Sequence, residues 1–316
     1  MSFRDLNTLV DAHQSVTTKV FVDGELVHQN LNAAVDRPWR VYSITKSVVS
    51  LLVGIAEAEG LLALEDPVAR FVPQWRESAS QEVTIRELLS MTSGRESTAS
   101  LDDEMISIAN DQTAYAIDLG QAATPGAQWH YDNIAAQILE PVLTAATGDL
   151  VEFAQERLFT PLNLGPVGWQ RDESGNPLAY AGITATADQL GALGQLVIGQ
   201  GVAEGRAVVP ATFLAEAVSP SSTLNSAYGY LWWTNREGSI LDGGVAVGSD
   251  HDGGSRSGRL APSVPADTVW ALGWGSQIMA IVPSEKMVAI RFGRRPRYPE
   301  TFTLEAFTAA ALAGIG

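Results

Sequence analysis

Cysteine is absent from the 316 residues of this chain, and histidine occurs only four times. The lack of thiols excludes disulfide bonds, cysteine nucleophiles and zinc sites with thiolate ligands. None of the histidines stands in the H-E-x-x-H spacing of zinc hydrolases, so we expect neither a metal site nor a cofactor. The G-x-S-x-G sequence that carries the serine of α/β-hydrolases is missing as well.

Positive charge and long apolar runs are also scarce. Lysine and arginine number 20 against 36 aspartates and glutamates, which gives a formal net charge of −16. Phosphate binding needs clustered basic residues, and the cluster seen is RRPR at 294–297, so nucleic acid and anionic membranes are not expected as partners. The longest apolar run, VVSLLVGIA, is too short for a membrane span, and the first residues lack a signal-peptide pattern. We therefore expect a cytoplasmic protein that acts on a small molecule; its oligomeric state stays open.

Local patterns divide the chain into elements. The segment KVFVDGELVHQ at 19–29 predicts a hairpin around an Asp-Gly turn. The mostly apolar stretch 43–59 predicts a buried helix. Residues 241–266 are rich in glycine, serine and aspartate and predict a long loop, either a lid or a plain surface insertion. The other expected helices are 83–94, 133–147, 184–201 and 301–315, and the other expected strands are 228–235, 268–283 and 286–293.

The order of these elements indicates how the chain is organised. Strands and a buried helix come first, helices fill the middle, and strands with a terminal helix come last. This order predicts a discontinuous α/β sheet domain made of residues 1–68 and 223–316, with a helical domain of residues 69–222 inserted between its two parts.

The clearest chemical signal is Ser43 followed by Lys46 at the start of the buried helix. Residues three apart on a helix share a face, with Cβ atoms about 5–6 Å apart, so the two side chains can touch. A serine needs an adjacent base to become a nucleophile, and a free lysine with a pKa of about 10.4 is protonated. Burial lowers that pKa, and bringing it to about 7–8 takes roughly 4 kcal/mol. The placement therefore predicts that Lys46 activates Ser43. The alternative is that Ser43 only caps the helix and that Lys46 reaches outward into water.

Two further stretches carry polar groups that could serve the same site. In PGAQWHYDNIAAQ, Tyr131 and Asn133 are two residues apart, so in an extended segment both point the same way. The phenol could relay a proton, and the amide could bind a substrate carbonyl or the lysine. In ALGWGSQIMAIVP, glycines 273 and 275 indicate close approach of another chain or ligand. The N–H groups of Ser276 and Ser43 could then form an oxyanion hole, in which one donor is worth about 2.7–4 kcal/mol.

Together these motifs resemble the serine β-lactamase and penicillin-binding protein superfamily. Ser43-Ile44-Thr45-Lys46 matches its S-x-x-K, Tyr131-Asp132-Asn133 matches the Y-x-N of class C enzymes and related esterases, and Gly273-Trp274-Gly275 occupies the place of K-T-G. The likeness runs from about residue 15 to the C-terminus. It is to the β-lactamase-related hydrolases, a group that includes 6-aminohexanoate-dimer hydrolase and several carboxylesterases. It implies an α+β fold, an antiparallel sheet flanked by helices beside an inserted helical domain, with the active site between them.

The resemblance also implies the reaction, a serine hydrolase that forms an acyl-enzyme on Ser43. Asn133, Trp274, Gly275 and Ser276 then contact the substrate or its oxyanion. Either Lys46 or Tyr131 could be the base, and this stays open. The family's K-T-G cation binds a carboxylate, and here Gly273 stands in its place, followed by Trp274. An ester or small amide with an apolar portion is therefore expected, with a true β-lactamase or D-Ala-D-Ala carboxypeptidase as the alternative. A catalytically silent binding protein on this fold is the alternative of another class.

Overall fold

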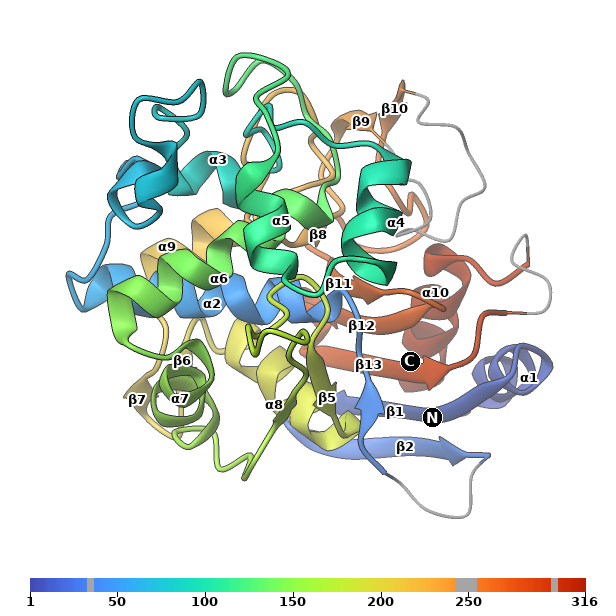
Figure 1. Cartoon of the computed structure of the whole chain (residues 1–316). Coiled ribbons are helices and arrows are strands. Elements are labelled where there is room, and N and C mark those ends of the chain that lie inside the picture. The colour runs from blue at the N-terminus through green and yellow to red at the C-terminus, as the bar shows by residue number, and fades with distance from the viewer. Residues whose placement is uncertain (33–36, 242–254, 297–300) are drawn as a thin grey trace.

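An antiparallel sheet of six strands forms the centre of the fold (Figure 1). The computed structural model describes residues 1–32, 37–241, 255–296 and 301–316. The strand order in the sheet is β2-β1-β13-β12-β11-β8, so the first and last thirds of the chain meet where β1 pairs with β13. The strands are β1 (Ser15–Val22), β2 (Glu25–Leu31), β8 (Trp233–Thr234), β11 (Val269–Gly273), β12 (Gln277–Val282) and β13 (Met287–Gly293).

Some predicted strands differ from those observed. The hairpin at 19–29 is confirmed, with Asp23 and Gly24 both at positive φ, as a tight two-residue turn requires. The segment 268–283 was expected to be one strand, but it folds into two, β11 and β12, joined by a turn at 274–276. The aromatic strand predicted at 228–235 is reduced to β8, because Leu231 adopts a positive φ and breaks the extended run.

The loop predicted at 241–266 is only partly observed. Residues 242–254 lie outside the described residues, and the lid hypothesis stays a prediction. Beyond it, Ser255–Gly258 forms a strand, β10, that pairs with β9 (Gly238–Leu241). The prediction of a continuous loop was wrong at this end, because the backbone groups of the polar residues pair with another strand. The remaining short strands are β3 (Trp39–Arg40), β4 (Gly168–Trp169), β5 (Ile183–Ala185), β6 (Val202–Ala203) and β7 (Arg206–Ala207).

Helices cover both faces of the sheet. Val288 of β13 lies against α8, where a Cβ on Gly194 would be only 2.6 Å from its side chain, so a glycine is needed at this contact. Val269 is aligned with Val288 through the strand between them, so its side chain points to the same face of the sheet. The next residue, Trp270, points to the other face and donates a hydrogen bond to Thr308 of α10. The helices are α1 (Arg4–Ala12), α2 (Ile44–Ala58), α3 (Ile85–Leu89), α4 (Ala99–Ser107), α5 (Gln112–Asp118), α6 (Asn133–Thr147), α7 (Leu150–Ala154), α8 (Ala187–Ile198), α9 (Ala211–Ala217) and α10 (Leu304–Ile315).

Helix α2 is the element that positions the site. It contacts β11 and β12 on one side and α6 on the other, and it runs through the middle of the molecule in Figure 1. Its residues from Ile44 to Ala56 are buried, as the apolar pattern predicts. Because the N-terminus of α2 meets the N-terminus of α6 and the β11–β12 turn, chemical groups from three distant segments of the chain converge at one place.

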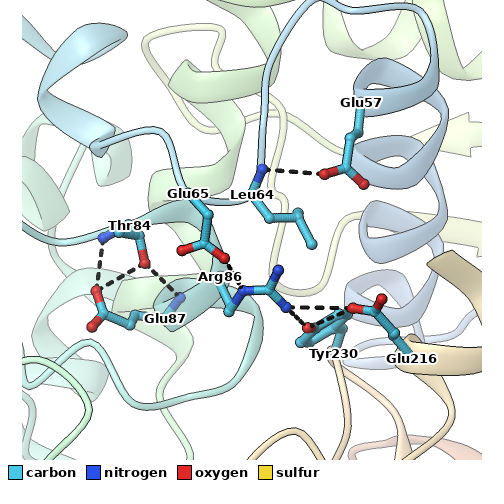
Figure 2. Close-up of polar contacts among 8 residues, drawn as sticks. All are labelled: Glu57, Leu64, Glu65, Thr84, Arg86, Glu87, Glu216 and Tyr230. Atoms are coloured by element: carbon cyan, nitrogen blue, oxygen red, sulfur yellow. Dashed lines mark hydrogen bonds and ion pairs between the residues drawn. The ribbon is translucent and has the colours of Figure 1, made fainter.

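A polar cluster ties α3 to the C-terminal half of the chain (Figure 2). Arg86 donates hydrogen bonds to Glu65 and to the phenol of Tyr230, and Glu216 accepts from both Arg86 and Tyr230. Beside it, a capping box between Thr84 and Glu87 starts the helix, as Figure 2 also shows. The carboxylates of Glu65 and Glu216 are largely exposed, so their ion pairs with Arg86 are weak, and we assign the cluster to local anchoring of α3.

The boundaries proposed at residues 68 and 223 stay a prediction. Helix α8, from the segment assigned to the helical domain, packs on β1, β12 and β13 of the sheet. Within the described ranges no single helix has the length and apolar character needed to cross a membrane. One bent pair, Asn133–Thr147 with Leu150–Phe159, meets those criteria only when both pieces are taken together.

Candidate active site

Ser43 stands immediately before helix α2, at the inner end of a strained backbone turn. Tyr42, the residue before it, has a φ of 50°, a conformation that costs a bulky residue energy and is found mostly where the surroundings enforce it. Ser43 occupies the N-cap position, yet its hydroxyl makes no capping hydrogen bond. The hydroxyl is therefore available for other partners, and the interpretation of Ser43 as a plain helix cap does not hold.

Lys46 points inward and is only 1% exposed. Its Nζ lies 3.0 Å from Ser43 Oγ, 2.6 Å from Asn133 Oδ1 and 2.9 Å from the carbonyl oxygen of Tyr180. The alternative of a lysine that reaches into water is thus excluded by its burial.

The protonation state of this amine follows from its surroundings. Burial lowers the pKa of Lys46 to about 7, against the opposing effects of Asp102 and Asp132. A neutral amine has two N–H bonds and one lone pair. The oxygens of Asn133 and Tyr180 can only accept, so they take the two N–H bonds. The lone pair is then directed at the hydroxyl of Ser43, which can donate its proton to it.

Tyr131 lies on the other side of the serine hydroxyl. Its phenol is in hydrogen-bond contact with Ser43, and its ring centroid is 5.1 Å from Lys46 Nζ. Burial is the main cause that raises the pKa of Tyr131 above its usual value, and the charge of Asp102 adds to it. At neutral pH the phenol is therefore protonated while Lys46 is close to half neutral, which makes the lysine the better proton acceptor.

An aromatic cluster holds the Tyr131 ring. The ring stacks on Trp233 with centroids 5.8 Å apart, and Tyr228 meets both rings edge-on, at 6.1 and 4.9 Å. Trp233 belongs to β8 and is 2% exposed. Because these rings exclude water around the phenol and the amine, they contribute to the burial that shifts both pKa values.

Asn133 is oriented by a residue that the sequence did not reveal. Its Nδ2 donates to Asp102 Oδ2 on α4, which leaves Oδ1 facing Lys46. Asp132, one residue earlier, caps α6 by accepting from the N–H of Ile134, so the side chain of Asn133 is not needed as a cap. Burial raises the pKa of the Asp102 carboxyl, while the hydrogen bond from Asn133 and the charge of Lys46 lower it.

The turn between β11 and β12 forms the third part of the site. Gly273 ends β11, and a Cβ there would lie 2.1 Å from the carbonyl oxygen of Val41, two residues before Ser43. The close approach predicted from this glycine is therefore a contact between two backbones of the same chain. Gly275 was expected to lie in a strand; it lies instead in the turn, where Gly275 and Ser276 both have positive φ. Among the described residues, neither the N–H of Ser43 nor that of Ser276 has a hydrogen-bond acceptor.

Trp274 lies at the rim of the site and is 52% exposed. Tyr42 meets its ring edge-on, with centroids 5.5 Å apart, and the guanidinium of Arg40 lies 4.9 Å from the centroid of Tyr42. An exposed tryptophan of this size beside a serine offers an apolar surface to a bound molecule.

The geometry thus brings together Ser43, Lys46, Tyr131 and Asn133, and it places Trp274 at the exposed rim. Sequence reasoning missed Asp102, the Tyr180 carbonyl and the aromatic support of the phenol. Nothing in the stretch LDDEMIS around Asp102 marks one carboxylate among several, and a backbone carbonyl has no sequence signature at all. No cluster of described residues could hold a metal ion.

An antiparallel sheet between helical layers, with a partly buried serine one turn before a buried lysine at the start of the central helix, is the arrangement of β-lactamase-like hydrolases. The chain belongs to the Beta-lactamase family, whose model matches residues 6–313. It is accordingly an enzyme, a hydrolase of this family.

Individual relatives are distant in sequence and close in fold. Esterase EstB of Burkholderia gladioli is 30% identical over 175 residues, which cover 46% of this chain and 44% of the esterase. A Bacillus anthracis protein assigned as a 6-aminohexanoate-dimer hydrolase superposes with a TM-score of 0.76 at 17% identity, over 98% of this chain and 80% of its own. A class C β-lactamase of Rhodobacter sphaeroides gives 0.67 at 17% identity, over 98% of each chain. The predicted fold and family are confirmed.

Proposed function

We propose that this enzyme hydrolyses esters or small amides through an acyl-enzyme on Ser43. The observation that carries the proposal is the environment of Lys46, a buried amine 3.0 Å from the serine oxygen whose other two partners are carbonyl oxygens. Such an amine can be neutral near pH 7 and has its lone pair toward the serine hydroxyl, which is what a general base requires.

The reaction begins when Ser43 Oγ forms a bond to the substrate carbonyl carbon and its proton passes to Lys46 Nζ. The carbonyl oxygen becomes negative and is held by the N–H groups of Ser43 and Ser276, both of which lack an acceptor in the described structure. Collapse of this intermediate breaks the bond to the leaving group. The Tyr131 phenol, which is protonated at neutral pH, gives its proton to the leaving oxygen or nitrogen and takes the one held by Lys46 in exchange. Water then attacks the acyl group by the same steps and frees the serine.

The rim residues favour a substrate with an apolar portion. Gly273 stands in the place of the cation that would bind a carboxylate, and Trp274 after it presents an exposed ring beside the site. The names of two similar proteins, an esterase and a 6-aminohexanoate-dimer hydrolase, agree with this choice. A cytoplasmic location remains a prediction.

A substrate screen with a matched variant tests the proposal. Purified protein is assayed with p-nitrophenyl esters of several chain lengths, small amides and nitrocefin, and Ser43→Ala is the control. We expect ester hydrolysis by the wild type, loss of at least about a thousandfold in the variant, and a trapped acyl group on Ser43 by mass spectrometry. Hydrolysis of nitrocefin far above that of the esters would instead identify a β-lactamase. Failure of a fluorophosphonate probe to label folded protein would identify a silent scaffold.

The dependence of kcat/KM on pH should report the protonation of Lys46. Because only neutral Lys46 can accept the proton, kcat/KM should rise with pH through an apparent pKa of about 7. The charge of Asp102 raises that pKa, so Asp102→Asn should move the acid limb to lower pH while keeping an oxygen that accepts from Asn133. Asp103→Asn, an exposed neighbour on the same helix, is the control and should leave the limb in place. An acid limb that stays where it is or moves upward in Asp102→Asn would contradict this assignment.

A further inference from the structure

Arg291 is a buried arginine without a carboxylate partner among the described residues. It lies on β13, is 0% exposed, and all five of its N–H bonds go to neutral oxygens. A buried charge normally needs an opposite charge, so this arrangement requires a reason. The five acceptors are the hydroxyl of Ser15 and the carbonyls of His13, Gly275, Ser276 and Arg294.

Two of these carbonyls belong to the turn that carries the proposed oxyanion donor. Arg291 Nη1 is 2.8 Å from the oxygen of Gly275 and 2.8 Å from the oxygen of Ser276. The side-chain amide of Gln277 lies 2.7 Å from the carbonyl oxygen of Gly293 and 3.0 and 3.3 Å from those of Trp274 and Gly275, so a second side chain also contacts carbonyls of this turn.

This arrangement determines where the N–H groups of the turn point. In a trans peptide the C=O and the following N–H are antiparallel, and the described chain has no cis peptide. The N–H of Ser276 belongs to the same peptide unit as the Gly275 carbonyl. It must therefore point away from Arg291, and it has no acceptor in the described part of the chain.

The positive charge of Arg291 also strengthens the Ser276 N–H as a hydrogen-bond donor. A cation on a carbonyl oxygen draws electron density through the peptide unit, and the N–H at its other end becomes a stronger donor. The guanidinium remains charged at neutral pH, since burial lowers the pKa of Arg291 only to about 9. The field of a charge buried behind the turn is also screened less than that of a surface charge.

We propose that Arg291 is a positioning residue that aims and polarises the Ser276 N–H toward the developing oxyanion, by holding the carbonyls of Gly275 and Ser276 from behind the turn. The inference rests on the proposed function, because it presumes an acyl-transfer reaction at Ser43. It predicts a defect in stabilising the tetrahedral intermediate and leaves the activation of the serine untouched.

The test compares Arg291→Lys and Arg291→Gln with the wild type, using the ester identified in the screen. Lysine keeps the charge but cannot make the forked contact, and glutamine keeps a donor without charge. We expect kcat to fall at least about tenfold, less than the roughly 10²–10³ for complete loss of one oxyanion donor, with KM within about threefold. An arylboronic acid, which forms a tetrahedral adduct on the serine, should lose affinity by a similar factor. The acid limb of kcat/KM should stay in place, because the surroundings of Lys46 are unchanged.

Ser15→Ala is the matched control, because it removes the Nε partner of Arg291 but neither turn contact. It should retain kcat and boronate affinity. Unchanged kcat and boronate affinity in a folded Arg291→Lys would overturn the inference. So would failure of both Arg291 variants to fold, which would assign the residue to the fold instead. Full activity in Ser43→Ala would overturn the proposed function itself, whereas an inactive Ser43→Ala beside a fully active Arg291→Lys would overturn this inference alone.

Discussion

Replacing Lys46 by methionine should lower kcat/KM for the best ester by about 10³–10⁴ and leave the fold intact. The expected loss is the upper range for removing a general base, because no other described side chain within reach of Ser43 has a pKa suited to the task. Methionine has a similar length and no charge, so it can occupy the buried position between α2 and α6. Rates of acylation by a fluorophosphonate probe, measured beside kcat/KM, would show that the defect lies in the attack by Ser43.

The same variant tests whether the amine is neutral when buried. A lysine whose folded pKa lies near 7 binds fewer protons than the unfolded chain between about pH 7 and 10. The free energy of unfolding of the wild type should therefore rise over that interval, relative to Lys46→Met, by about 1.4 kcal/mol per pH unit, and the difference should level off below pH 7. Urea unfolding at several pH values measures it.

The control for both measurements is Lys286→Met, at an exposed lysine that pairs with Asp23 at the surface. It should keep wild-type activity and a wild-type dependence of stability on pH. Substantial activity in Lys46→Met would make Tyr131 the base. Parallel stability curves for wild type and Lys46→Met would show that the amine is charged in the folded protein at neutral pH.

Replacing Gly273 by alanine should damage both stability and catalysis. The new Cβ would lie 2.1 Å from the carbonyl oxygen of Val41, and this neighbour is backbone, so one of the two segments must move. Overpacking of this kind typically costs about 1–3 kcal/mol. The two segments carry Ser43 and Ser276, and a displacement of about 1 Å between reacting groups can lower a rate by about a hundredfold.

Thermal unfolding and kcat of Gly273→Ala are compared with those of Gly168→Ala. Gly168 also lies in a strand, but a Cβ there would be 3.4 Å from Thr184, an ordinary contact distance. We expect the Gly168 variant to resemble the wild type. If Gly273→Ala retained both its stability and its kcat, the close packing of the turn against the start of α2 would be irrelevant to the site.

Sequence patterns were reliable where a local cause decides the structure. The hairpin at Asp23-Gly24 depends on two adjacent residues that tolerate positive φ, and the helix at 43–59 depends on a continuous apolar run. Patterns failed where the cause is not local. The segment 268–283 was predicted to be one strand, but it turns at 274–276. Side chains of Gln277, just after the turn, and of Arg291, on the next strand, hold that turn, and the segment itself gives no sign of these contacts.

The sequence by itself determined the family through its motifs, and the resemblance to that family implied the antiparallel sheet with its covering helices. It also predicted that Ser43, Lys46, Tyr131 and Asn133 share one site, because these residues stand in short motifs whose spacing follows from helix and strand geometry. Only the tertiary structure decided how the motifs cooperate. The contact of Lys46 with Asn133 spans 87 positions of the chain, and that of Asn133 with Asp102 spans 31. The contact of Arg291 with the turn at Gly275 spans 16. Desolvation and hydrogen-bond direction depend on distances in space, and no local pattern in a chain encodes them.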